Sequence, residues 1–321
     1  MDNKVTKSRL ADFLSYEWIL MIIIVVLSIV GWNFVYTVAG VKLSKGQQFM
    51  LSYDEYLTSE FGGEFITLAA QDQRFCYDVL QVGVESITPS NEQDVLSIRY
   101  NTRDVDVLVT DNSVKEDGTT RLKTIIDGYR CWSFDQMLKD GKSYLSKFVK
   151  NGIDYQSDQT VVYNYDNMNE QKIDSYFLIR QKGDNRFRND EQKNQGKLKE
   201  RKRIEKLCKE LKTLDYLLTE HKDIFVQYKR FEQLLSKNPD DKELIDRIQY
   251  EKVECYALNL GALTDGEYQP SDFFTLDGSS KDLALISFNY LTDQPDLQYE
   301  NISVLNFAVK ILSNRLDGFT A

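Results

Sequence analysis

The sequence predicts an α/β domain with a helical insertion, preceded by one transmembrane helix. Three observations predict it: an uncharged apolar run near the start, short segments rich in β-branched and aromatic residues that alternate with helical patterns, and a Lys/Glu/Leu-rich block between such segments. The 321 residues are 42% hydrophobic and 28% charged, which is the composition of a folded protein and excludes wholesale disorder.

Composition also excludes several functions. With 40 basic and 50 acidic residues the net charge is −10, which gives no general attraction to a phosphate backbone, so we expect no nucleic-acid partner. One histidine cannot supply a His-rich metal site, and no phosphate loop, G-x-S-x-G or HExxH motif occurs. We therefore predict no enzymatic activity, no metal and no cofactor. A hydrolase that uses two carboxylates stays open as an alternative.

The apolar run covers residues 18–41, which carry no charge over 24 residues. At 1.5 Å per residue, such a helix crosses a hydrocarbon core of roughly 30 Å, so we expect it to span the lipid bilayer. A cleaved signal peptide is the alternative, because Thr37-Val38-Ala39 loosely fits a small-x-small site. The run is longer than the roughly 7–15 apolar residues of a usual signal peptide, which favours a retained anchor.

Basic residues on the two sides of the run predict its orientation. Three precede it and two follow it: Lys4, Lys7 and Arg9, then Lys42 and Lys45. Because the more basic flank stays in the cytoplasm, we expect residues 1–17 there and the main domain on the extracytoplasmic side of the cell membrane.

Charge divides the remainder into three segments. Residues 42–180 have a net charge of −7, residues 181–261 of +3 and residues 262–321 of −6. The first segment is predicted to be α/β, the second a charged helical subdomain, and the third an α/β segment that returns to the first lobe.

Strands are expected over 48–53, 78–84 and 104–111, which are short and rich in β-formers. Residues 92–100 fit either a helix or a strand. Ser133 begins a helix, since its spacing to Gln136 fits a capping box.

In the charged segment, Ile204, Leu211 and Leu218 recur at one heptad position and predict a helix. A second helix is expected over 224–235. A third is expected to start with Asn238 as its N-cap and to end near Gly261. The C-terminal segment is predicted to form a strand over 282–288 and a helix over 303–316.

The four cysteines show no C-x-x-C spacing, which removes the usual zinc and redox motifs. Two of them, Cys208 and Cys255, fall on predicted helices of the charged segment. The sequence leaves two alternatives open. One is a disulfide between Cys208 and Cys255, and the other is four free thiols, which include Cys76 and Cys131.

The order of these features resembles a known family. An anchor, a strand that ends Ser52-Tyr53-Asp54, the strand 104–111, a helical insertion and a late strand before Asn306-Phe307-Ala308-Val309-Lys310 are similar to type 2 periplasmic (extracytoplasmic) solute-binding proteins, and in particular to membrane-anchored, uncharacterised relatives from Gram-positive bacteria. The resemblance covers most of residues 45–321 and implies a two-lobe periplasmic-binding-protein-like fold. The chain departs from the family in its shorter length and in lacking a lipid-modified cysteine.

The candidate ligand-binding residues follow the two strands that end this way. They are Tyr53, Asp54, Thr110, Asp111 and Asn112. If the strands are parallel neighbours, their carboxyl ends meet at the edge where open α/β sheets bind ligands. A tyrosine ring and carboxylate acceptors suit a small polar, cationic or polyhydroxylated ligand. The alternative is that these residues are solvated strand ends.

We therefore expect a membrane-anchored protein that binds a small solute or an envelope component without catalysis. The alternative is a scaffold in which the binding fold is degenerate and the helical subdomain docks on another membrane protein.

Two further segments each allow a binding role or a purely structural one. The basic run 197–203 can attract an anionic surface or be a solvated helix face, and residues 184–188 can carry a binding motif or form a turn into a helix.

Overall fold

The computed structural model describes residues 22–32, 47–54, 57, 62–87, 92–150, 159–276, 278–289 and 299–321. The chain divides into two units, Met1–Ser44 and Lys45–Ala321. Residues 22–32 are helical and their apolar side chains are exposed. The other residues of the predicted span 18–41 lie outside the described part. Within the described residues, no helix has the length and apolarity that crossing a membrane requires.

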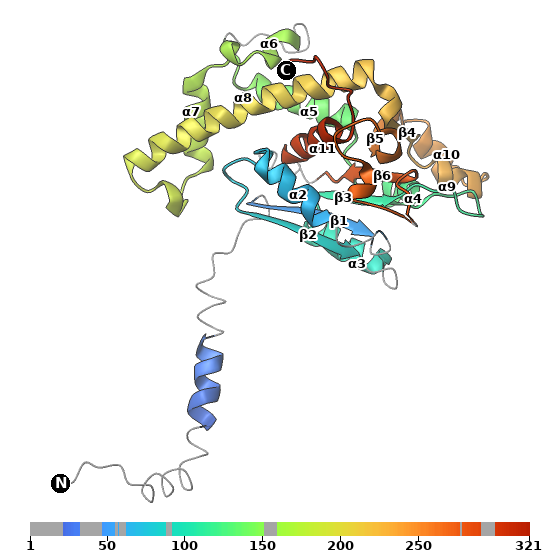
Figure 1. Ribbon diagram of the computed structural model, residues 1–321, viewed down its shortest axis with the longest axis horizontal. Helices are drawn as coiled ribbons and strands as arrows, with labels where there is room; N and C mark the ends of the chain where they lie inside the picture. Colours follow the sequence, from blue (N-terminus) through green and yellow to red (C-terminus); the bar gives the residue numbers. More distant parts are fainter. Residues whose placement is uncertain are drawn as a thin grey trace, which may run out of the picture. The chain divides into compact units, whose positions relative to one another are not determined.

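A six-stranded mixed sheet forms the centre of the second unit (Figure 1). Its spatial order is β2 (Gln81–Ile87), β1 (Gln48–Asp54), β3 (Val107–Asp111), β6 (Leu283–Ser287), β5 (Val253–Asn259) and β4 (Phe225–Lys229). The strands β2, β1 and β3 are parallel, whereas β6, β5 and β4 each pair antiparallel with their neighbour. The predicted α/β class is confirmed, and the strands expected at 48–53 and 104–111 are parallel neighbours.

Helices cover both faces of the sheet, which makes three layers. One face packs against α2 (Gly62–Gln71), α5 (Phe134–Ser146), α8 (Asp190–Glu220) and α11 (Glu300–Leu312), which share one hydrophobic cluster. The other face packs against α3 (Glu92–Thr102) and α4 (Arg121–Gly128) in a second cluster. The sequence of residues 92–100 fitted either a helix or a strand, and in the structure these residues are helical.

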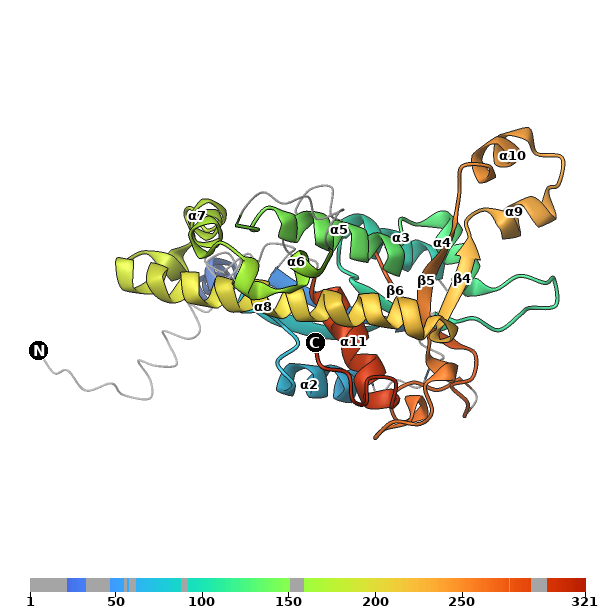
Figure 2. The ribbon, with the colours of Figure 1, turned by 90° about the horizontal axis from the view of Figure 1, so that it is seen from above.

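The longest helix is α8, with 31 residues (Figure 2). It starts with a capping box in which the Asn189 side chain accepts from the Gln192 backbone and the Gln192 side chain accepts from the Asn189 backbone. Gly196 lets it pack closely on α7 (Glu170–Arg180), because a Cβ there would lie 2.2 Å from a ring carbon of Phe177. Residues 184–188 form the short 3-10 helix η4 (Asn185–Phe187) and its flanks, so they are a turn into a helix.

The helix predicted over 224–235 is wrong, because residues 225–229 form β4 and only α9 (Glu232–Lys237) is helical. Phe225 and Tyr228 are three residues apart, which suggested one helix face. In the sheet they are buried on opposite faces, Phe225 in the first hydrophobic cluster and Tyr228 in the second. Both faces are covered, so the alternation of a half-buried strand is missing.

The helix predicted from Asn238 to Gly261 is also wrong in most of its length. The N-cap is Asp241, whose side chain accepts from the Glu243 and Leu244 backbones, and α10 (Lys242–Ile248) ends well before β5. The strands β4 and β5 pair within the same sheet as β1, β3 and β6. The segment 181–261 is therefore not purely helical, and it supplies one edge of the sheet.

Candidate functional site

The candidate residues at the ends of β1 and β3 are largely buried. Asp54 and Thr110 have no exposed surface, and Tyr53 is 6% exposed. The chain leaves β1 toward β2 on one side and returns to β3 on the other side of β1, which makes a topological switch at this edge. The sequence predicted the shared edge of the two strand ends, but not the switch. The structure thus brings Asp54 and Thr110 together at the expected place.

Arg121, which sequence analysis did not identify, completes this strand-end cluster (Asp54, Thr110 and Arg121). Its Nε and Nη2 donate to the two carboxylate oxygens of Asp54 at 2.7 and 2.6 Å, and Thr110 Oγ1 donates to Asp54 at 2.8 Å. Arg121 is placed by α4, whose N-cap Thr120 accepts from the Lys123 backbone. A carboxylate that already accepts a bidentate guanidinium and a hydroxyl is poorly suited to bind a cationic ligand.

Asp111 and Asn112 do not join this cluster. The carboxylate of Asp111 accepts from the backbone N and the hydroxyl of Ser113, both at 2.7 Å, which closes a local turn. The Asn112 backbone donates to the Asp282 carbonyl at 2.7 Å. These two residues therefore stabilise the loop after β3, and they are partly exposed.

A second polar cluster, which sequence analysis missed, joins α7 and α8 to the segment before β2. We call it the ion network: Tyr77, Asp78, Arg180, Arg186, Glu200 and Arg203. Arg180 pairs with Asp78 at 2.5 Å and with Glu200 at 2.7 Å, and Arg203 pairs with Glu200 at 2.7 Å. Arg186 adds a contact to Asp78 at 2.9 Å.

Because the network is buried, its charged groups shift one another's pKa values. Glu200 is fully buried, and burial alone would raise its pKa. Arg203 and Arg180 outweigh burial, so the pKa of Glu200 lies below its usual value of 4.5. The pKa of Arg203 is raised by Glu200 and Tyr144 despite its own burial. The network holds both groups charged and tied to each other, which suits a structural clamp.

One sequence signal could have revealed Glu200. Glu200, Ile204, Leu207 and Leu211 follow one another at successive spacings of four, three and four residues, so Glu200 lies on the apolar stripe of α8. A carboxylate on a buried stripe needs a cationic partner. The partners themselves lie 3 to 123 residues away along the chain, and nothing in the spacing identifies Tyr77.

Several hollows in the described part of the chain are lined by none of the strand-end cluster residues. One, of about 580 Å³, is lined by residues that include Tyr163, Tyr165 and Lys209. Another, of about 460 Å³, lies where α7 passes into α8 and is lined by Leu178 and three basic residues, Lys182, Arg188 and Lys193. Neither contains a candidate residue from the strand ends, but the second is lined by part of the segment 184–188, for which the sequence left a binding motif open.

In the part of the chain that the structure describes, no group of three or more His, Cys, Asp and Glu side chains is placed to hold a metal ion. All four cysteines are free thiols.

A scan against protein-family models, a search of curated proteins and a search of solved structures gave no significant match. The resemblance to solute-binding proteins stays a prediction.

Proposed function

We propose that this chain is a membrane-anchored interaction protein, which binds a partner protein through its surface and performs no reaction. The observation that carries the proposal is a set of three exposed apolar side chains close together in the chain, which we call the patch: Ile245 of α10, Tyr250 after it and Val253 at the start of β5, which are 43%, 81% and 60% exposed. Exposed tyrosine beside aliphatic side chains is typical of contact surfaces.

The patch is held firmly, as a contact surface requires. The turn from β4 into α9 docks on α4: Tyr228 Oη donates to Asp127 at 2.9 Å, and the Phe231 backbone donates to the other Asp127 oxygen at 2.7 Å. Arg247 of α10 lies over the ring of Phe231 at 4.1 Å. Helices α9 and α10 stand off the end of the sheet beside β4 (Figure 2), where a partner can approach.

The strand-end cluster supports the same reading. The polar groups that a solute would need are already engaged: Asp54 with Arg121 and Thr110, and Asp111 with Ser113. A ligand that uses Asp54 would have to displace a buried ion pair, which costs several kcal/mol, about 3–5. Internal pairing favours a structural role for these residues.

Photo-crosslinking tests the proposal. A benzophenone amino acid placed at Tyr250 of the full chain in native membranes should give one discrete high-mass adduct on irradiation. Ile245→Asp, which puts a charge in the patch, should remove that adduct. The same probe at Ile98 of α3, which is 62% exposed, is the matched control and should give none. A Tyr250 adduct that persists unchanged in Ile245→Asp, or no adduct at all, would overturn the proposal.

Binding of a small solute or envelope component is the second candidate, favoured by the β1/β3 switch alone. A ligand for that edge would raise the melting temperature by mass action, as RT ln(1 + [L]/Kd). Asp111→Ala should then abolish the shift. A screen of sugars, amines, peptides and wall fragments that leaves the melting temperature unchanged would remove this candidate.

A further inference from the structure

We infer that the end of the α7–α8 hairpin rests on an anionic phospholipid surface. We call residues 178–193 the hairpin tip. The inference extends the proposed function by giving the anchored protein a second contact, with lipid, and it rests on the predicted membrane anchor.

Charge is the first observation. The hairpin tip holds five basic and three acidic side chains, a local net charge of +2 in a chain whose net charge is −10. Lys182 and Arg188 are exposed, and both line the hollow of about 460 Å³ together with Lys193. Of the opposing acids, Asp190 pairs with Lys193 at 3.7 Å across an exposed turn, and both Asp190 and Glu191 lie in the first turn of α8, where the helix dipole stabilises them.

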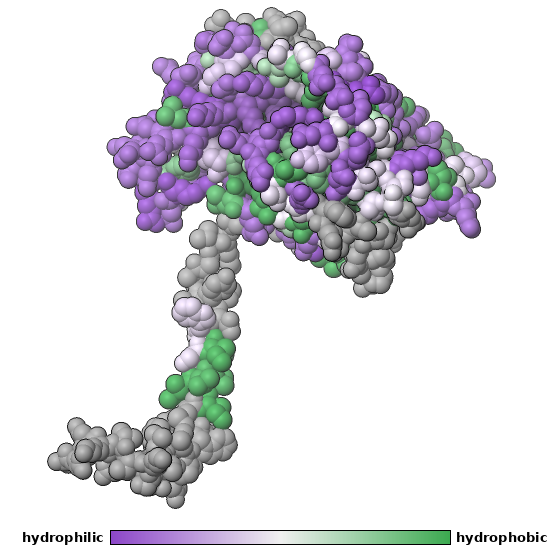
Figure 3. Space-filling view, viewed as in Figure 1, coloured by the Kyte–Doolittle hydropathy of each residue, from purple (hydrophilic) through white to green (hydrophobic). Residues whose placement is uncertain are grey.

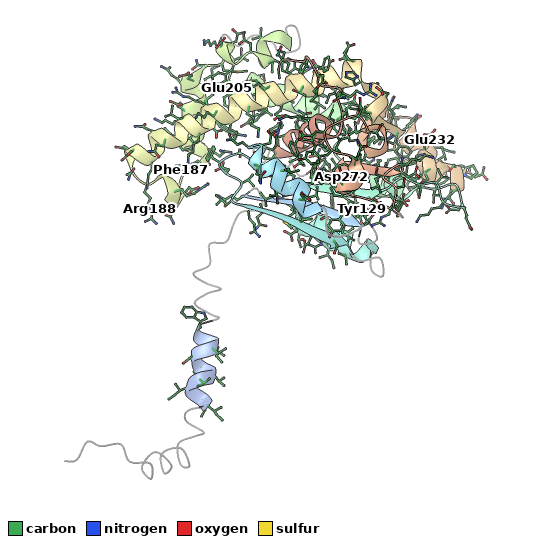
Figure 4. The ribbon with its side chains drawn as sticks, in the orientation of Figure 1. Tyr129, Phe187, Arg188, Glu205, Glu232 and Asp272 are labelled. Carbon is green, nitrogen blue, oxygen red and sulfur yellow. The ribbon has the colours of Figure 1, made fainter. Side chains whose placement is uncertain are left out.

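Apolar exposure is the second observation. Leu178 and Ile179 of α7 are 45% and 75% exposed, and Leu178 lines the same hollow as the three basic residues. Basic groups beside exposed aliphatic side chains are the combination that binds an anionic headgroup and enters the acyl boundary. Phe187 and Arg188 lie together at the free end of the hairpin (Figure 4), and the surface there is mostly hydrophilic with few apolar side chains (Figure 3).

The third observation is where the chain enters the domain. The Gln47 carbonyl, just before β1, accepts from the Leu80 backbone at 2.8 Å. Two residues earlier, Asp78 accepts from Arg186 at 2.9 Å and from Gln181 at 3.0 Å, both in the hairpin tip. The start of β1 and the hairpin tip are thus joined through one short segment. Only six residues separate the predicted span from Gln48, a reach of about 20 Å.

Rigid support is the fourth observation. The ion network fixes the base of the tip through Arg180 and Arg186, and Gly196 lets Phe177 and Phe187 pack against α8. The ring centroids of Phe177 and Phe187 are 5.0 Å apart. A surface that is already ordered loses little entropy on binding, which strengthens a weak electrostatic contact.

Hydrogen exchange of the full chain in lipid nanodiscs tests this inference. Discs of phosphatidylcholine are compared with discs that also contain anionic phosphatidylglycerol. We expect backbone amides of α7 and η4 to exchange several-fold more slowly in the anionic discs, and this protection to disappear at about 0.5 M salt, where charges are screened within a few Å.

The decisive variant is Lys182→Gln/Arg188→Gln/Lys193→Gln. Each basic residue near an anionic surface contributes roughly a factor of five, so the triple variant should weaken the tip–lipid association about 100-fold and lose the protection. Lys115→Gln/Lys242→Gln/Lys252→Gln is the control, because it removes the same charge from exposed residues outside the tip and should retain it.

Equal exchange in the two kinds of disc, or equal loss of protection in the two triple variants, would overturn the inference. Retention of the chain in the discs reports on the anchor separately, and the Tyr250 adduct reports on the partner surface at the opposite end of the domain (Figures 1 and 2). Failure of the lipid contact is therefore distinguishable from failure of the proposed function.

Discussion

Glu200 is a buried charge whose removal has a defined cost. It accepts from Arg180, Arg203 and Tyr77, so Glu200→Gln removes a counter-charge from two buried guanidiniums, of which Arg180 keeps its pair with Asp78. Removing one partner of a buried pair destabilises a protein by about 3–5 kcal/mol. We expect a loss of that size in urea unfolding of the full chain in detergent. Glu205→Gln on the same helix, which breaks a half-exposed pair with Lys209, should change stability by less than about 1 kcal/mol.

The same residue predicts a pH dependence. Because the folded pKa of Glu200 lies below 4.5, its contribution is complete above that pH and is lost as the pH falls through the folded pKa. Asp72 and Asp184, whose pKa values are also lowered by their basic partners against burial, add to the loss in the same direction. The stability difference between wild type and Glu200→Gln should therefore shrink below pH 4.5. A difference that stays constant from neutral pH to the acid transition would contradict this account of Glu200.

The four thiols give a prediction about reactivity. Burial raises the pKa of Cys131, Cys208 and Cys255 to about 12 and raises that of Cys76 as well. Since the thiolate is the reactive form, labelling of the native protein by a disulfide reagent near pH 8 should be at least about 100-fold slower than labelling in urea. Fewer than four labelled cysteines in urea without reductant would instead reveal a disulfide.

At the scale of elements, α8 crosses α5 at a glycine. A Cβ on Gly141 would lie 2.5 Å from a terminal carbon of the buried Leu211 side chain, so Gly141→Ala forces this side chain or the helices to shift. Overpacking of this kind costs about 1–3 kcal/mol, and the variant should unfold at lower urea. Gly128→Ala at the end of α4 is the control, because nothing lies within 4 Å of its added Cβ. Equal midpoints for the two variants would show that this crossing is not tightly packed.

Sequence patterns revealed the helices with one polar face and the strands β1, β3 and β6, and they missed β4 and β5, which lie in the segment of charged, helix-like composition. The helix stripe of α8 and the cap at Ser133 are visible because one face is polar. The strands β4 and β5 are covered on both faces, so their apolar residues follow no period of two and their charged surroundings suggested helices. β5 is a strand because it pairs with β6, and this contact between separate segments of the chain is not visible in the local sequence pattern.

The sequence predicted where the candidate side chains lie in the fold, but not which other side chains they contact. Parallel strands with their ends at one edge follow from short β-rich segments, so Asp54 and Thr110 were placed correctly. Arg121 was not, because its pairing with Asp54 depends on how α4 folds back over the sheet, 67 residues further along the chain. The ion network depends in the same way on contacts between distant segments.

At the scale of the whole molecule, the domain presents two different surfaces at opposite ends. The hairpin tip is basic with two exposed aliphatic residues, and the end formed by α9 and α10 carries the patch of Ile245, Tyr250 and Val253 (Figures 1 and 2). The sheet between them has both faces covered, and its strand-end polar groups pair internally. This division of surfaces suits a protein that connects a membrane to a partner.

Protease accessibility tests most directly whether the chain is a single-pass membrane protein with its main domain outside the cell. Intact cells carrying the full chain with a tag at residue 1 are treated with external protease, and inverted vesicles are treated in parallel. We expect the main domain beyond residue 45 to be digested in intact cells while a membrane-bound fragment retains the tag. A main domain that resists protease on intact cells and is digested in inverted vesicles would reverse the orientation, and release of the untreated full chain by alkaline carbonate would contradict the anchor itself.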